Sequence, residues 1–156
     1  MKYAGIDIGL KGAIAIIDDD YDKLPVMYPL PYTKEKTLDT ELFLSYLDDV
    51  DIVGIEHPIG IFNVGTSRRY TDYGEIKGLC RLNNRQIKPL QPSIWKKHFH
   101  LTKDKEQSIL LVRELYPGIC LLRTGKSKKP DDNLAEAVLI AYYIRKFKNE
   151  IFGNDK

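Results

Sequence analysis

The sequence predicts an α/β fold in which helices cover a mixed β-sheet. Short apolar runs near the N-terminus are separated by tight turns, which favours antiparallel hairpins. Later apolar runs alternate with segments whose apolar residues recur at helical spacing, which favours strands joined by helices. The chain has 156 residues and no segment typical of a linker, so we expect one domain over residues 1–156.

The first third of the chain predicts three strands. Lys2–Gly9 is short, apolar and ends at a glycine, and a Lys-Gly turn leads into a second strand, Ala13–Asp18. Pro25–Leu30 is a third candidate, and its prolines favour a position at the edge or end of the sheet. The three runs should form an antiparallel meander.

Helices and strands then alternate. Asp39 or Thr40 can cap a short helix, and the apolar run Asp51–Glu56 is typical of a buried strand. Arg68–Leu82 is predicted as a helix, and Gln86–Leu90 as a strand. The apolar stripe of that helix has four members: Tyr73, Ile76, Leu79 and Cys80.

The remaining segments predict three helices. Pro92–Phe99 has a proline suited to a first helical turn, and Thr102 can cap a helix that ends near Tyr116. A basic loop, Arg123–Lys129, precedes the most regular pattern, a long helix over Asp131–Lys148. The predicted core face of the middle helix consists of Ile109, Leu110, Val112 and Leu115.

Several classes of protein are excluded by simple features. The longest apolar runs, such as Ala137–Ile144, are far shorter than the roughly 20 residues of a membrane span. Asp7 lies where a signal peptide would have its apolar region. Cys80 and Cys120 form no C-x-x-C pair, which argues against a cysteine zinc site or disulfide framework. We therefore expect a cytoplasmic protein without a membrane partner.

Charge is distributed unevenly along the chain, although the net charge is only +2. Residues 1–57 contain 5 basic and 12 acidic residues, whereas residues 58–112 contain 10 basic and 4 acidic ones. Residues 113–156 contain 9 basic and 6 acidic ones. This asymmetry predicts an acidic centre and a basic surface in one molecule.

Carboxylates occur where strands and a helix should be buried. Asp7 and Glu56 lie within or at the end of apolar strands, where an unpaired acid is costly. Glu136 follows Asp132 at i+4 and lies in an apolar stretch of the last helix. Taken singly, the strand acids can be explained by an ion pair or a cap, and Asp131 and Asp132 by the helix dipole.

Gathered together, these acids indicate a metal site. Four carboxylates repel one another strongly unless cations are present, and oxygen ligands of this kind select Mg²⁺ or Mn²⁺. Two such ions about 4 Å apart can activate a water and stabilise the leaving oxygen of a phosphodiester. We therefore expect two Mg²⁺ ions, for which Mn²⁺ can substitute.

Basic residues predict a nucleic-acid surface, because Lys and Arg neutralise phosphates. Solvated faces are the alternative explanation for each single run. Phe62 lies in a glycine-bearing loop after Glu56, where it can stack on a base or, alternatively, anchor the loop in the core. The candidate basic residues are Arg68, Arg69, Lys96, Lys97, Lys103, Lys105, Lys126, Lys128 and Lys129.

Three segments together resemble the RuvC family of Holliday junction resolvases. They are Gly5-Ile6-Asp7-Ile8-Gly9 with Ala13–Asp18, then Val53–Glu56, and then Asp131–Ala137. Their order and spacing match over nearly the whole chain, which is most similar to bacteriophage and poxvirus members. The resemblance implies an RNase H-like fold, with a mixed five-stranded sheet flanked by helices. It further implies a homodimeric, Mg²⁺-dependent endonuclease that nicks opposed strands of a four-way DNA junction. If the chain is encoded by a phage or virus, the resemblance implies that it acts inside the host cell.

The resemblance also assigns roles to residues. Asp7 and Glu56 match the strand acids of the family, and Glu136 stands where the family usually has an aspartate. The other helix acid falls at Asn133 by spacing, so we favour Asp132 over Asp131 as the fourth ligand. Phe62 resembles the loop aromatic that contacts the junction. One of Lys96 and Lys97, and one of Lys103 and Lys105, resemble family lysines near the scissile phosphate, and we favour Lys96 as the catalytic one.

Three other functions compete with junction resolution. An RNase H-like enzyme that acts on RNA-containing substrates would share the same acids. The Gly5–Gly9 opening also resembles that of actin-like ATPases and sugar kinases, but those proteins need two such domains and a second glycine-rich phosphate motif. A module that binds branched DNA without cutting it has no need for a carboxylate cluster.

Overall fold

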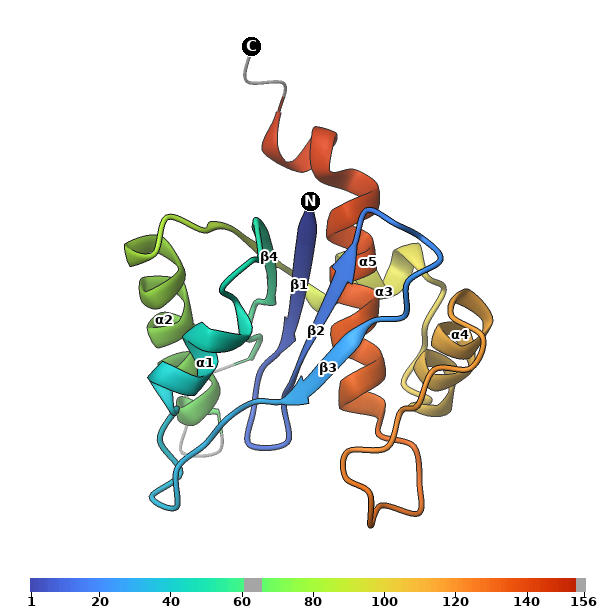
Figure 1. Ribbon diagram of the computed structural model, residues 1–156, viewed down its shortest axis with the longest axis horizontal. Helices are drawn as coiled ribbons and strands as arrows, with labels where there is room; N and C mark the ends of the chain where they lie inside the picture. The colour runs from blue at the N-terminus through green and yellow to red at the C-terminus, as the bar shows by residue number, and fades with distance from the viewer. Residues whose placement is uncertain (61–65, 154–156) are drawn as a thin grey trace.

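A five-stranded sheet forms the centre of the protein, in a computed structural model that describes residues 1–60 and 66–153 (Figure 1). The strand order is β3-β2-β1-β4-β5. β1, β2 and β3 pair antiparallel, whereas β4 runs parallel to both β1 and β5. The predicted mixed sheet is confirmed. The strands are β1 (Lys2–Asp7), β2 (Ala13–Asp18), β3 (Val26–Pro29), β4 (Ile52–Glu56) and β5 (Gln86–Leu90).

Within the described residues, five helices cover the two faces of this sheet (Figure 1). α1 (Thr40–Tyr46) and α2 (Ser67–Leu82) pack on one face. α3 (Pro92–His98), α4 (Glu106–Leu115) and α5 (Asp132–Phe152) pack on the other. None of the helices in the described part of the chain combines the length and apolarity that a membrane crossing requires.

The turn between β1 and β2 explains why the first strand is shorter than predicted. β1 ends at Asp7 and not at Gly9, because the chain is already turning there. Gly9 adopts a φ of +140°, which disfavours residues with a side chain, and its carbonyl accepts a hydrogen bond from the amide of Gly12 at 2.6 Å. The tight turn aligns the two strands so that Asp7 pairs with Ala13.

The α5 helix lies directly on β1 because the strand carries a glycine at the crossing. A Cβ at Gly5 would lie 2.1 Å from the carbonyl oxygen of Ala137 and 2.4 Å from the amide nitrogen of Ala141. Gly54, the partner of Gly5 in the parallel register, faces Ile144 of the same helix. Two adjacent strands therefore present glycine to α5, which brings the helix backbone close to the sheet.

The structure decides between the two predicted caps of one helix and extends another helix beyond its predicted end. α1 has Asp39, not Thr40, as its cap, because the Asp39 carboxylate accepts from the amide of Leu42. α5 extends to Phe152 instead of ending at Lys148. The helix departs locally from helical geometry at Phe147, just before the extra turn, and in that turn Ile151 and Phe152 pack against the hydrophobic core.

α4 is the element that the sequence predicted least well. Thr102 does not cap it, because the helix begins at Glu106 and Thr102 bonds instead to the side chain of Gln107. Leu110 was predicted in the core but is 62% exposed, since Val112 and Ser108 occupy the buried face. The other three predicted core positions are buried or partly buried.

Candidate metal centre

The parallel pairing of β1 and β4 brings the two strand acids together. Ile6 pairs with Ile55, and one residue further along Asp7 and Glu56 stand side by side at the carboxyl ends of their strands. Because strand residues alternate between faces, each acid shares the face of the glycine two residues before it. That is the face on which α5 packs.

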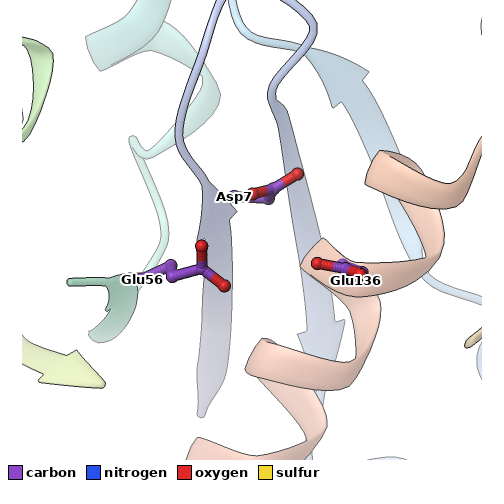
Figure 2. Close-up of side chains that lie close together, drawn as sticks. All are labelled: Asp7, Glu56 and Glu136. Atoms are coloured by element: carbon purple, nitrogen blue, oxygen red, sulfur yellow. The ribbon is translucent and has the colours of Figure 1, made fainter. Parts of the chain in front are cut away.

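Glu136 completes a cluster of three carboxylates. It immediately precedes Ala137, the residue whose backbone crosses Gly5, so the close helix–strand contact sets its position. One carboxylate oxygen from each of Asp7, Glu56 and Glu136 lies within 4.8 Å of the others. Figure 2 shows the three side chains converging from β1, β4 and α5. The predicted convergence of two strands and the last helix on one acidic centre is therefore observed for these three residues.

Burial makes this cluster unfavourable when it is fully ionised. The pKa of the Asp7 carboxyl is raised well above its usual value, first by burial and then by the carboxylates of Glu56 and Glu136. Burial also raises the pKa of Glu56, whose Oε2 atom is buried without a hydrogen-bond partner among the described residues. The arrangement has the character of a site that needs added positive charge.

Basic side chains from three separate elements reach toward these acids. Their contacts counter part of the negative charge, and each is close enough to be a charge-assisted interaction. The pairs are Arg69 Nη2 with Glu56 Oε1 at 2.9 Å, Lys96 Nζ with Glu136 Oε2 at 2.9 Å, and Lys105 Nζ with Asp132 Oδ2 at 2.8 Å.

The two acids at the start of α5 have different surroundings. Asp131 caps the helix by accepting from the amides of Asn133 and Leu134, and it forms an ion pair with Arg123. Asp132 instead lines a cavity of about 450 Å³ together with the three clustered acids. It is not one of the three within 4.8 Å, so its role as a fourth ligand stays a prediction.

Only one lysine of each neighbouring pair in the sequence lines this cavity. Lys96 and Lys105 line it, whereas Lys97 and Lys103 are exposed and do not. The direction of each side chain depends on how α3 and the segment before α4 are rotated on the sheet, which spacing alone does not reveal. Lys126 and Lys128 are likewise exposed, in the loop before α5.

The arginines and the loop aromatic complete the set of predicted residues. Arg69 reaches the acidic cluster, whereas Arg68 pairs with the buried Asp72 on the other side of the sheet. Phe62 lies outside the described residues. Sequence reasoning missed Ile59, which lines the cavity and is 58% exposed, and no periodic pattern marks it.

The clustered ligand atoms of Asp7, Glu56 and Glu136 are carboxylate oxygens, the donor type that hard divalent cations prefer. The orphaned Glu56 oxygen and the mutual repulsion of the acids fit such a cation. A cavity that combines clustered acids with lysines at its wall can hold a cation and an anionic substrate side by side.

The strand order and helix arrangement define the RNase H-like fold of RuvC. Thermus thermophilus RuvC, solved in complex with a Holliday junction substrate, matches with a TM-score of 0.68 at 14% identity, over 96% of both chains. The fowlpox virus Holliday junction resolvase matches with a TM-score of 0.62 at 16% identity, over 94% of this chain and 99% of that one. No family model matches the sequence, and comparison with curated proteins finds no match.

Proposed function

We propose that the protein is a Mg²⁺-dependent, structure-selective DNA endonuclease that resolves four-way junctions by paired nicks. The observation that carries this proposal is the cluster of Asp7, Glu56 and Glu136, with oxygens within 4.8 Å, on the fold of RuvC. Two proteins with that fold were crystallised with Holliday junction DNA. The active unit we propose is residues 1–156 as one nuclease domain, acting as a homodimer.

The three clustered carboxylates would hold two Mg²⁺ ions together with Asp132, and Mn²⁺ can substitute. When bound, the ions supply a polarised water and charge stabilisation at the leaving oxygen of the phosphodiester. For Asp132 to serve as a ligand, its ion pair with Lys105 has to open. That ion pair is weak, because 74% of the Lys105 side chain is exposed to water.

Lys96 and Lys105 would then bind the DNA phosphate. In the absence of substrate each lysine neutralises an acid of the cavity, Glu136 and Asp132 respectively. A phosphate in the cavity offers these lysines a new anionic partner while cations take over the acids. Lys96 is the basic residue that we assign next to the scissile phosphate, because it is only 32% exposed and faces the cavity.

The remaining basic residues would bind the phosphate backbone of the junction arms. Their contribution is independent of sequence and falls as salt concentration rises. The residues assigned to this surface are Arg68, Arg69, Lys97, Lys103, Lys126, Lys128 and Lys129, with Phe62 as a junction contact.

A substrate panel tests the proposal. Labelled four-way junction, flap, replication fork, duplex and RNA–DNA hybrid are incubated with Mg²⁺ or with EDTA, and products are sized on denaturing gels. We expect symmetrical paired nicks on the junction, with 5′-phosphate and 3′-hydroxyl ends, and no cleavage in EDTA. Preferential cleavage of the RNA–DNA hybrid would overturn the proposal in favour of an RNase H-type activity.

A further inference from the structure

A second cavity adjoins the one that contains the acids. It has a volume of about 540 Å³, within the roughly 300–1,000 Å³ of small-ligand pockets. We call it the α4 groove and define it by Ile109, Leu110, Arg113, Lys129 and Pro130. Lys105 and Asp132 line both cavities, so the α4 groove opens onto the metal centre.

The wall of the α4 groove is apolar at its middle. Leu110 is 62% exposed, and Ile109 and Pro130 lie beside it in the same cavity. A single exposed leucine is common on protein surfaces. Here, however, three apolar side chains line one concave site, which offers a contact area for a flat apolar group.

Basic side chains surround this apolar wall. Arg113 and Lys129 form no ion pair within the described residues, and Lys105 is held only by its exposed pair with Asp132. Glu106 is the other acid of the groove. The lining therefore combines an apolar wall with cations that have no fixed partner, which complements a ligand with a ring and a phosphate.

We propose that the α4 groove receives one unstacked nucleotide of the strand to be cut. This proposal rests on the proposed function, because the nucleotide is the neighbour of the phosphate at the metal centre. Its base packs on Leu110, Ile109 and Pro130, and its phosphate lies between Arg113 and Lys129. Bases at the centre of a junction are the easiest to unstack, so occupancy of the groove favours branched DNA over duplex.

Fluorescence of 2-aminopurine measures this directly. Four-way junctions carry one 2-aminopurine at successive positions beside the cut, and the cleavage-deficient Asp7→Asn protein binds them in Mg²⁺. The probe brightens when it leaves the stack, and aliphatic side chains do not quench it. We expect one position to brighten several-fold and to become protected from acrylamide, which shows that the unstacked base is enclosed.

Two variants in the Asp7→Asn background assign the signal to the groove. Leu110→Glu places a charge on the apolar wall, and Leu110→Ala removes most of the contact. Both should abolish the acrylamide protection. Leu24→Glu is the matched control, because Leu24 is 51% exposed and follows β2 at the end of the sheet away from the acids. Circular dichroism confirms that each variant is folded.

Two outcomes overturn the proposal while leaving the proposed function intact. One is a bound and cleavable junction in which no position brightens. The other is brightening and protection that are the same in the Leu110 variants and in the Leu24→Glu control. If the wild-type protein neither binds nor cuts four-way junctions, the proposed function itself fails and the nucleotide site fails with it.

Discussion

The protein buries two aspartates in contrasting surroundings: Asp7 at the end of β1, on the sheet face that α5 covers, and Asp72 within α2. The hydroxyl of Tyr32 donates to Asp72 Oδ2 at 2.6 Å, and Arg68 Nε lies 3.4 Å from Oδ1. The Arg68 guanidinium also lies over the Tyr32 ring, 5.2 Å from its centroid. Asp72 thus has both a donor and a counter-charge from the chain itself.

Asp7 is surrounded mainly by like charge. Its neighbours Glu56 and Glu136 raise its pKa in addition to burial, and the smaller opposing effects of Arg69 and Lys96 offset this only in part. Burial of an acid alone therefore does not identify a metal centre. What distinguishes Asp7 is that the fold gathers further carboxylates around it, an arrangement consistent with a metal site.

The largest difference between the two sites should appear in catalysis. Asp7→Asn and Glu136→Gln should retain junction binding and lose cleavage by on the order of 10³-fold, because loss of a metal ligand removes several kcal/mol of transition-state stabilisation. Tyr32→Phe, at the Asp72 site, should leave the cleavage rate of the folded protein unchanged. Single-turnover cleavage assays measure both. Wild-type cleavage by either acid variant would show that the ligand assignment is wrong.

Mg²⁺ should stabilise the folded protein when the Asp7 cluster is intact, whether or not the Asp72 site is altered. At a Mg²⁺ concentration of 100 times the dissociation constant, ligand linkage adds about 2.7 kcal/mol to the free energy of unfolding. Thermal unfolding with and without Mg²⁺ should show this gain in the wild-type protein and in Tyr32→Phe, and little of it in Asp7→Asn. An equal gain in all three proteins would place the cation elsewhere.

The hydrogen bond between Tyr32 and Asp72 should matter for stability and not for cleavage. Tyr32→Phe leaves a buried carboxylate oxygen without its donor, which should lower the free energy of unfolding by about 1–3 kcal/mol. Urea unfolding measures the change, and Tyr28→Phe is a control because Tyr28 stacks on Tyr46 at the edge strand. If Tyr32→Phe were as stable as the wild type, the hydrogen bond would contribute nothing net.

The pH dependence of stability should also report the raised pKa of Asp7. Because the pKa of Asp7 is raised in the folded state, the folded protein binds more protons than the unfolded chain above the ordinary value of 3.8. In EDTA, the free energy of unfolding should therefore fall as pH rises from about that value through the raised pKa, and Asp7→Asn should flatten this fall. A pH profile that is unchanged in Asp7→Asn would contradict the assignment.

The smallest effect concerns two adjacent lysines. Lys97→Ala should reduce the salt dependence of junction binding by about one unit of slope, as expected for one lost phosphate contact. Lys96→Ala should in addition slow cleavage of the bound junction, since only Lys96 lines the cavity. Binding titrations over a salt series together with single-turnover rates distinguish the two. Equal cleavage rates would show that Lys96 is not near the scissile phosphate.

Much of the fold and three of the acids follow from the sequence alone. Short apolar runs bounded by turns and apolar residues at helical spacing are local properties, so the order of strands and helices can be predicted from them. Asp7, Glu56 and Glu136 stand out because each lies within or at the end of an apolar element, where an acid without a partner is costly. The two glycines that let α5 approach the sheet are also visible, at Gly5 and Gly54, although their pairing is not.

The family resemblance favours Asp132 and Lys96 over their neighbours, but only the tertiary structure shows which residues face the site. Asp131 caps α5, whereas Asp132 lines the cavity. Among the lysines, Lys96 and Lys105 line the cavity, and their neighbours Lys97 and Lys103 do not. The exposure of Leu110 and the pairing of Asp72 with Tyr32 were likewise not predictable. The physical reason is the same in each case: the rotation of a helix on the sheet, and the partner it meets there, depend on contacts between segments far apart in the sequence.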